Sequence, residues 1–178
     1  MKHLNRILLF TMTLSLLTFS SCSNDDDGGS SGAAADGTLE AQVDGSSFQS
    51  LDITSSATVA NNGQNLIIIA SNSDGNAFSF TIFGYSGVGT YPFGGGVNIT
   101  NVASYTETDV DINNPQNSTT EIWQAPYDDT MVGELRVAEE TDAKVIGTFE
   151  FTCQNVNGDQ SIKTITNGSF DLQKQVSN

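Results

Sequence analysis

The sequence predicts an all-β fold, an antiparallel β-sandwich of about ten short strands, with a barrel as the alternative. From Thr38 onward, apolar and polar residues alternate in short runs, which is the period of half-buried strands. Gly, Asn, Asp and Ser separate these runs, as in Asn61-Asn62-Gly63 and Asn157-Gly158-Asp159, and such tripeptides favour turns. No window of useful length has the period of an amphipathic helix.

The first segment is predicted to be a signal peptide. Lys2 and Arg6 precede a mostly apolar run over residues 7–19, and two serines follow it. A positive start, a short apolar run and small residues are typical of a cleaved leader. As a helix, the run would span about 20 Å, which is less than the ~30 Å hydrocarbon core of a bilayer. Residues 1–21 are therefore expected to be removed.

Cys22 directly follows the two serines, and this arrangement resembles the bacterial lipobox, in which a small residue precedes a lipidated cysteine. Phe19 stands where that pattern usually has a small or β-branched residue. The resemblance implies cleavage after Ser21 and attachment of fatty-acid chains to Cys22, so the membrane would be a partner through lipid. An ordinary signal peptide with a cysteine at its cleavage site is the alternative.

Residues 22–37 are predicted to be a flexible acidic tether, because they combine Asp, Gly, Ser and Ala with no large apolar side chain. Its r.m.s. span would be about 20 Å. The run of Asp25, Asp26 and Asp27 also resembles the export signal of Bacteroidetes lipoproteins. That resemblance implies a lipid-anchored location in the outer membrane, on the cell surface, with the periplasmic face as the alternative.

Residues 38–178 are predicted to form the folded domain. In the stretch Lys144–Gln154, Phe149 and Cys153 share one face, so Cys153 is expected to be a buried, unreactive thiol. The run Leu66-Ile67-Ile68-Ile69 is continuously apolar, which favours a strand covered on both faces. The predicted strands are Leu39–Val43, Ser47–Gln49, Ser56–Ala60, Asn65–Ser71, Ala77–Tyr85, Gly89–Pro92, Val97–Tyr105, Ser118–Ala125, Val132–Glu139, Lys144–Gln154 and Ser161–Gln173.

The core of this domain is expected on the apolar side of the alternating runs. The residues predicted to be buried are Ile68, Phe80, Leu135, Val137, Val145, Phe149, Phe151 and Phe170.

Several short motifs occur in a characteristic order along the domain. Gly89-Thr90-Tyr91 and the tract Gly94-Gly95-Gly96 are followed by Val145–Phe151 and Ile165–Asp171. Together with the opening Leu39–Phe48 stretch, they resemble an uncharacterised family of Bacteroidetes outer-membrane lipoproteins built as one β-sandwich. The likeness covers about residues 38–175, and it implies a fold and an envelope location without implying any catalytic residue.

Composition excludes several classes of function. Removal of the leader would leave four basic residues against 21 acidic ones, which argues against nucleic acid as a partner. The only histidine, His3, would also be lost. Without an imidazole, neither Ser-His-Asp nor Cys-His catalysis nor histidine-ligated zinc is available. We therefore predict that the protein is not an enzyme and holds no cofactor or metal.

Paired carboxylates keep a glycosidase as the remaining enzymatic alternative, because that chemistry needs only an acid and a base. Such pairs also arise readily by chance in a chain with 21 acidic residues. The pairs in question are Asp109 with Asp111, Asp128 with Asp129, and Glu139, Glu140 and Asp142.

Two features of the domain concern binding and modification. Trp123 and Tyr127 lie at the end of a predicted strand, where they could form a platform on which sugar rings stack. The alternative, which we favour, is that Trp123 fills the core or covers a sheet edge. Asp129-Thr130-Met131 resembles the Bacteroidetes O-glycosylation motif, which implies that Thr130 is modified. The sequence thus favours a non-catalytic binding or structural role, with a glycan or a protein as ligand, and a passive surface or adhesion protein as the alternative.

Overall fold

A computed structural model describes residues 33–96 and 101–177, and these residues are all-β as the sequence predicts. Cys22, Asp25, Asp26 and Asp27 lie outside the described residues. None of the helical segments within the described part of the chain could cross a membrane. The strands are β1 (Leu39–Val43), β2 (Ser46–Gln49), β3 (Ser56–Ala60), β4 (Asn65–Ser71), β5 (Ala77–Phe83), β6 (Gly89–Phe93), β7 (Val102–Asp109), β8 (Thr119–Ala125), β9 (Gly133–Glu140), β10 (Lys144–Gln154) and β11 (Ile162–Val176). Two short 3₁₀ turns, η1 (Asp52–Thr54) and η2 (Pro115–Asn117), complete the described structure.

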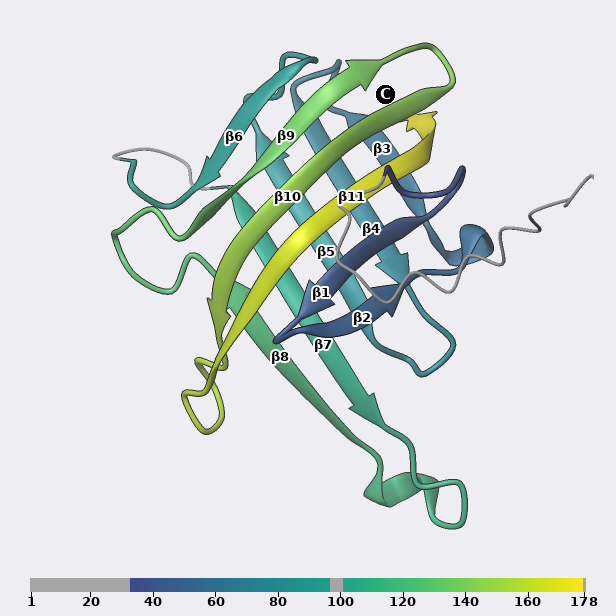
Figure 1. The fold of residues 1–178 in the computed structure, drawn as a ribbon, viewed down its shortest axis with the longest axis vertical. Coiled ribbons are helices and arrows are strands. Elements are labelled where there is room, and N and C mark those ends of the chain that lie inside the picture. The colour runs from purple at the N-terminus through teal and green to yellow at the C-terminus, as the bar shows by residue number, and fades with distance from the viewer. Residues whose placement is uncertain (1–32, 97–100, 178) are drawn as a thin grey trace, which may run out of the picture.

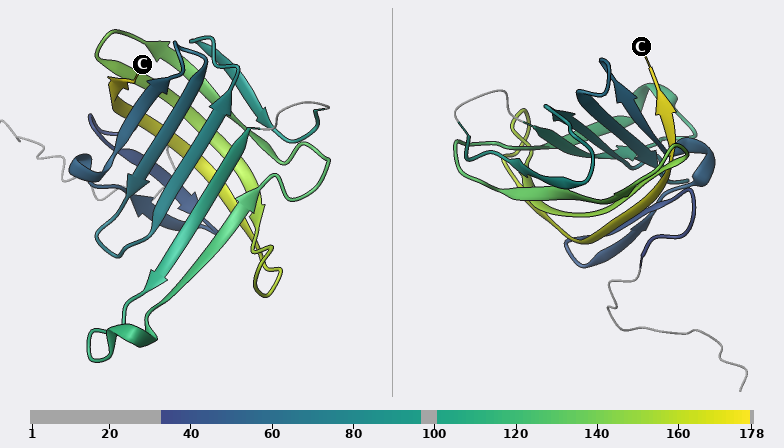
Figure 2. Two further views of the ribbon diagram at one scale, coloured as in Figure 1. Left: turned by 180° about the vertical axis from the view of Figure 1, so that it is seen from behind. Right: turned by 90° about the horizontal axis from the view of Figure 1, so that it is seen from above.

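One sheet contains all eleven strands, in the order β2-β1-β11-β3-β4-β5-β7-β8-β10-β9-β6. This sheet folds over into the two layers of a sandwich (Figures 1 and 2). We call β6, β9, β10, β11, β1 and β2 the front layer, and β3, β4, β5, β7 and β8 the back layer. The layers join where β11 pairs with β3 and where Gln154 of β10 is paired with Gln124 of β8.

The pairing of β11 with β3 is parallel, whereas the other strand pairs of the described chain are antiparallel. The antiparallel sandwich that the sequence predicts is confirmed, with this one pair as the exception. The reason is the length of β11, which has 15 residues. Its last residues extend past β10 and β1 and meet β3, which runs in the same direction.

The core lies between the layers and is rich in aromatic rings. Phe78 and Phe80 of β5 project from the back layer, and their ring centroids lie 5.5 and 4.9 Å from that of Phe149 on β10. Such separations are typical of interacting aromatic pairs. All eight residues that the sequence predicts to be buried are at most 3% exposed, so that prediction is confirmed. Cys153 is also buried, as predicted.

Three glycines within front-layer strands allow the rings of neighbouring strands to pack. Gly147 is paired with Phe170, Gly168 with Phe149, and Gly133 with Phe151. A Cβ atom at Gly147 would overlap the Phe170 ring and the carbonyl oxygen of Arg136. These pairs therefore require the absence of a side chain on one strand of each pair.

Two sequence-based expectations about individual strands are corrected. β4 is covered on one side only, since Leu66 and Ile68 are buried while Ile69 is 51% exposed. β7 continues to Asp109 rather than ending at Tyr105. Its last residues pair with β8 in a hairpin that extends beyond the rest of the sheet (Figure 1), so both faces are in solvent and the apolar alternation disappears.

Candidate functional site

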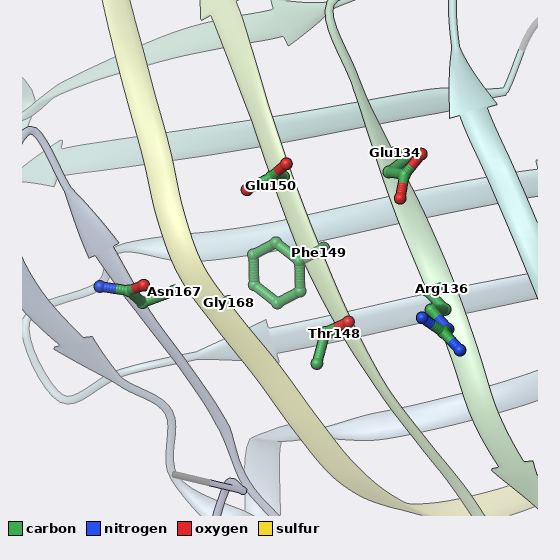
Figure 3. Close-up of a pocket in the computed structure, with 7 residues that line it drawn as sticks. All are labelled: Glu134, Arg136, Thr148, Phe149, Glu150, Asn167 and Gly168. Atoms are coloured by element: carbon green, nitrogen blue, oxygen red, sulfur yellow. The ribbon is translucent and has the colours of Figure 1, made fainter. Parts of the chain in front are cut away.

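The outer surface of the front layer contains a shallow hollow of about 260 Å³. We call it the front hollow (Figure 3). It lies over β9, β10 and β11, so its walls come from three neighbouring strands. The residues that line it are Glu134, Arg136, Thr148, Phe149, Glu150, Asn167 and Gly168.

The antiparallel register of β9 and β10 places the charged groups together. Glu134 is paired with Glu150, and Arg136 is paired with Thr148. Directly paired residues have Cβ atoms about 5 Å apart and share a face of the sheet. Like charges directly opposite one another are destabilising, so the two carboxylates stand together at a cost to the fold. Local features that lower stability in this way are expected at functional sites.

The opposite wall of the front hollow is an irregularity in β11. The register between β10 and β11 shifts between Phe149 and Phe151, which leaves an extra residue in β11. Asn167 lies in this bulge with a φ of 52°, in the left-handed region that Asn tolerates better than most residues. Asn167 is exposed at the margin of the hollow, and its amide lies on the side of β11 that faces away from Glu150 and Arg136 (Figure 3).

Arg136 is the cation of the front hollow, and it is available for a ligand. Within the described residues, Lys144, Lys163 and Lys174 each form an ion pair with a carboxylate. Arg136 is exposed and forms no ion pair with another described residue, although Glu134 and Glu150 line the same hollow. A guanidinium offers five donors in a planar fork, which suits hydroxyl and carboxylate oxygens.

The front hollow therefore combines strong acceptors with strong donors in a small area. Glu134 and Glu150 can accept hydrogen bonds, Arg136 and Asn167 can donate them, and Thr148 can do either. A molecule with several hydroxyl groups would satisfy both kinds of partner. A strongly anionic ligand is disfavoured, because two carboxylates outnumber the one guanidinium.

A second hollow of about 260 Å³ lies beside the β1–β2 hairpin. Lys163 is among the residues that line it, and its Nζ is 2.9 Å from Glu107 Oε1 and 4.0 Å from Asp44 Oδ2. The ammonium also lies 4.3 Å from the centroid of the Trp123 ring, within the range of a cation–π contact. The one cation of this hollow is thus already bound by the chain's own side chains, which leaves the front hollow as the better candidate for a ligand site.

The structure places Trp123 in the core, the alternative that the sequence left open. It is 3% exposed, its indole N–H donates a hydrogen bond of 2.9 Å to Ser161 Oγ, and Lys163 lies over its ring. The expectation of a stacking platform formed by Trp123 is corrected by this burial, since a sugar ring needs an exposed ring face. Tyr127 is half-buried, and its hydroxyl lies 3.1 Å from Thr152 Oγ1.

Thr130 lies in the exposed loop between β8 and β9, where a modifying enzyme could reach it. Its hydroxyl donates a 2.6 Å hydrogen bond to Asp128 Oδ1, and its backbone N–H donates to the same oxygen. These two bonds lower the pKa of Asp128. Glycosylation of Thr130 stays a prediction.

The described residues contain no group of three or more histidine, cysteine or acidic side chains arranged to hold a metal ion. Two of the carboxylates singled out in the sequence already have partners within the chain. Asp111 accepts hydrogen bonds from the backbone of Asn113 and Asn114, and Glu140 pairs with Lys174 at 2.7 Å. Cys153 is unsuited to act as a nucleophile, because burial raises the pKa of its thiol to about 12.

The sequence pattern does not identify the front hollow as a site, although it places one lining residue, Phe149, in the core. Thr148 and Glu150 do lie on the outward face that alternation assigns to Lys144–Gln154. Their partners on β9 cannot be assigned by counting back from the connecting turn, because the β9–β10 register shifts between Ile146 and Gly147. The bulge that places Asn167 at the margin of the hollow has no comparable sequence signal.

The chain belongs to the family described as a domain of unknown function (DUF6252), whose model matches residues 35–172. The matched stretch begins just before β1 and ends within β11, so it includes the front hollow. No curated protein and no solved structure matches the chain significantly.

Proposed function

We propose that this DUF6252 chain is a non-catalytic, lipid-anchored protein of the bacterial outer membrane that binds a neutral glycan in its front hollow. The observation that carries the proposal is an exposed guanidinium that forms no ion pair with any residue of the described segments, next to two carboxylates and an amide. Neutral sugars present both hydroxyl donors and hydroxyl acceptors, and the front hollow offers partners for each.

The binding mode follows from the layout of the front hollow. Glu134 and Glu150 would accept hydrogen bonds from neighbouring hydroxyls, while Arg136 and Asn167 would donate to hydroxyl or ring oxygens. The hollow is open and about 260 Å³, which suits one sugar unit within a longer chain that continues along the sheet. Affinity for a single unit should be low, and several units or several copies of the protein would raise it.

The location half of the proposal rests on the sequence resemblances at the N-terminus. The apolar run of residues 7–19 is too short to span a bilayer as a helix, so lipid on Cys22 would provide the attachment. Each buried CH₂ contributes about 0.8 kcal/mol, and one acyl chain gives only marginal binding, so stable attachment needs more than one chain. The acidic domain offers the membrane surface little electrostatic attraction.

The binding proposal is tested with the full chain purified in mild detergent and applied to an array of neutral and anionic glycans. We expect signals on neutral glycans and weak or no signal on anionic ones. Arg136→Ala should weaken binding about 10- to 100-fold, since hydrogen bonds to charged groups contribute roughly 1.5–3 kcal/mol. Glu150→Gln should weaken binding in the same direction.

Glu121→Gln is the matched control for Glu150→Gln, because it removes the same charge from an exposed glutamate on β8, away from the front hollow. It should leave binding unchanged. Equal losses in both variants, or no binding to any glycan, would contradict the proposed site and favour a passive surface protein. Release of new reducing ends from a bound glycan would instead assign the Glu134–Glu150 pair to a glycosidase.

The anchor is tested separately in intact cells. Cys22→Ser should abolish incorporation of a fatty-acid probe and prevent cleavage of the leader. Changing Asp25, Asp26 and Asp27 to Ala should keep the lipid but reduce digestion of the domain by protease added outside the cells. Labelling of the Cys22→Ser chain would refute the anchor, whereas unchanged digestion of the Asp variant would refute only the export signal.

A further inference from the structure

The outer face of the back layer differs from the rest of the molecule in having no charge. Strands β3, β4, β5, β7 and β8 point alternate residues away from the core, and none of these outward residues is Asp, Glu, Lys, Arg or His. They are serines, threonines and small or aliphatic side chains with a few amides and one phenylalanine. The absence is notable in a chain with 21 acidic residues and a net charge of −15.

Apolar side chains lie exposed on this face. Ile69 is 51% exposed, Ile122 is 45% exposed, and Val102 and Phe83 are each 37% exposed. The pairing registers place Thr81 between Ile67 and Val102, and Ser79 beside Ile69, so aliphatic and hydroxyl side chains alternate across the strands. The pairs within the back layer have no register shift, so this face has no bulge to obstruct a flat partner.

We propose that the outer face of the back layer, which we call the uncharged face, docks against the same face of a second copy of this chain. Charge is the first argument. Two copies at a net charge of −15 repel each other, and contact through the front layer would bring glutamates toward glutamates. When two copies meet through the uncharged face, no carboxylate on the face of one copy lies against a carboxylate on the face of the other. A cationic partner would instead be drawn to the acidic surfaces elsewhere.

Area is the second argument. Five strands at about 4.8 Å spacing, with about six residues each at 3.3 Å, give a face of roughly 500 Å². The pair would bury roughly 1,000 Å², which is at the lower limit for a specific interface. Two sheet faces pack in this way within sandwiches, with their strands about 30° apart. We therefore expect a weak dimer of two-fold symmetry, which confinement to one membrane surface would strengthen.

The test uses cysteine crosslinking of the full chain in excess mild detergent. Ser79→Cys and Ile69→Cys place a thiol near the middle of the uncharged face, and Ile162→Cys places one on β11 in the front layer. Ile162 is the matched control for Ile69, because both isoleucines are 51% exposed in strands. The unsubstituted chain gives the background that comes from Cys22 and Cys153.

With a mild oxidant, we expect a covalent dimer from Ser79→Cys or Ile69→Cys and background only from Ile162→Cys. Raising NaCl from 20 to 300 mM should increase the dimer several-fold, because salt screens the repulsion between the acidic copies and leaves the uncharged contact intact. Adding Thr81→Lys to Ser79→Cys should remove the dimer. No dimer from either back-layer cysteine, or an equal yield from Ile162→Cys, would overturn the proposal.

Discussion

The two layers of the sandwich share one core but differ in regularity. The back layer has no glycine in its strands, no register shift and no charge on its outer face. The front layer has glycines in β6, β9, β10 and β11, register shifts in three of its strand pairs, and a hollow with three charged residues. Irregular backbone and polar recognition groups thus occur together, as they do where bulges redirect side chains toward a site.

This difference also separates the two proposals. The front layer offers a concave group of directional donors and acceptors, which suits a small polar ligand. The back layer offers a regular surface with few strong polar groups, which suits another protein surface. Both layers contribute buried side chains to one shared interior.

The first prediction concerns that shared interior. Phe149→Ala in the front layer and Phe80→Ala in the back layer should each lower the free energy of unfolding by about 3–5 kcal/mol, because each removes a packed ring from the core. Urea unfolding of the two variants measures the loss. A loss below about 1 kcal/mol in one variant alone would mean that the two layers do not contribute equally to the core.

The second prediction concerns how well the front layer seals the core. Burial raises the pKa of Cys153 to about 12, so at pH 8 its thiolate fraction is far smaller than in the unfolded chain. A maleimide should modify Cys153 about 10³-fold more slowly in buffer than in denaturant, measured by the mass of the labelled peptide. Ser104→Cys, on the outer face of β7, is the reference and should react at similar rates in both solvents.

The third prediction tests the glycines of the front layer. Gly147→Ala should cost about 1–3 kcal/mol, because the added methyl would meet the Phe170 ring and the Arg136 carbonyl oxygen. Gly96→Ala is the control, since a Cβ atom at this exposed position meets nothing within 4 Å. The unfolding temperatures of the two variants measure this loss. Equal unfolding temperatures would show that the Gly147–Phe170 pair is looser than its geometry indicates.

The sequence predicts one layer better than the other for a physical reason. Burial of one face enforces alternation, so the inward residues Phe80 and Phe149 could be identified from periodicity alone. The front hollow depends on which residue of one strand lies beside which residue of another. That register changes at the bulges in β9 and β11, and a single extra residue moves every following side chain to the other face.

Contacts between residues far apart in the sequence likewise leave no local pattern from which they could be predicted. The burial of Trp123 depends on Ser161 and Lys163, which follow it by about 40 residues. The exposure of Ile69 depends on the absence of a covering layer over β4, which no local pattern encodes. The turn at Asp44-Gly45 was predictable, because both residues have positive φ in a two-residue hairpin and the Asp-Gly pair favours that turn.

The last prediction has the smallest effect and concerns pH. At the end of β10, Lys144 Nζ lies 2.8 Å from Asp36 Oδ1 and 3.1 Å from Asp171 Oδ1. The hydrogen bond from Lys144 and then its charge hold the pKa of Asp36 below the ordinary 3.8. A carboxylate with a lowered pKa stabilises the fold above pH 3.8, and this contribution is lost as the pH falls through its folded-state pKa.

The pKa of Lys144 shifts in the opposite direction to that of Asp36. Hydrogen bonds to Asp36 and then Asp171 raise its pKa above 10.5, so its contribution is complete below pH 10.5 and is lost as the pH rises through the folded-state pKa. Asp36→Asn should therefore lower the unfolding temperature slightly at pH 7, and the difference should vanish near pH 2 and in 1 M NaCl, because exposed pairs are weak and screened. Ser79→Ala on the uncharged face is the control, and its small effect should be the same at every pH because it alters no charge. A loss in Asp36→Asn that persists near pH 2 would mean that Asp36 acts through its hydrogen bond from Gln173 of β11 rather than through its charge.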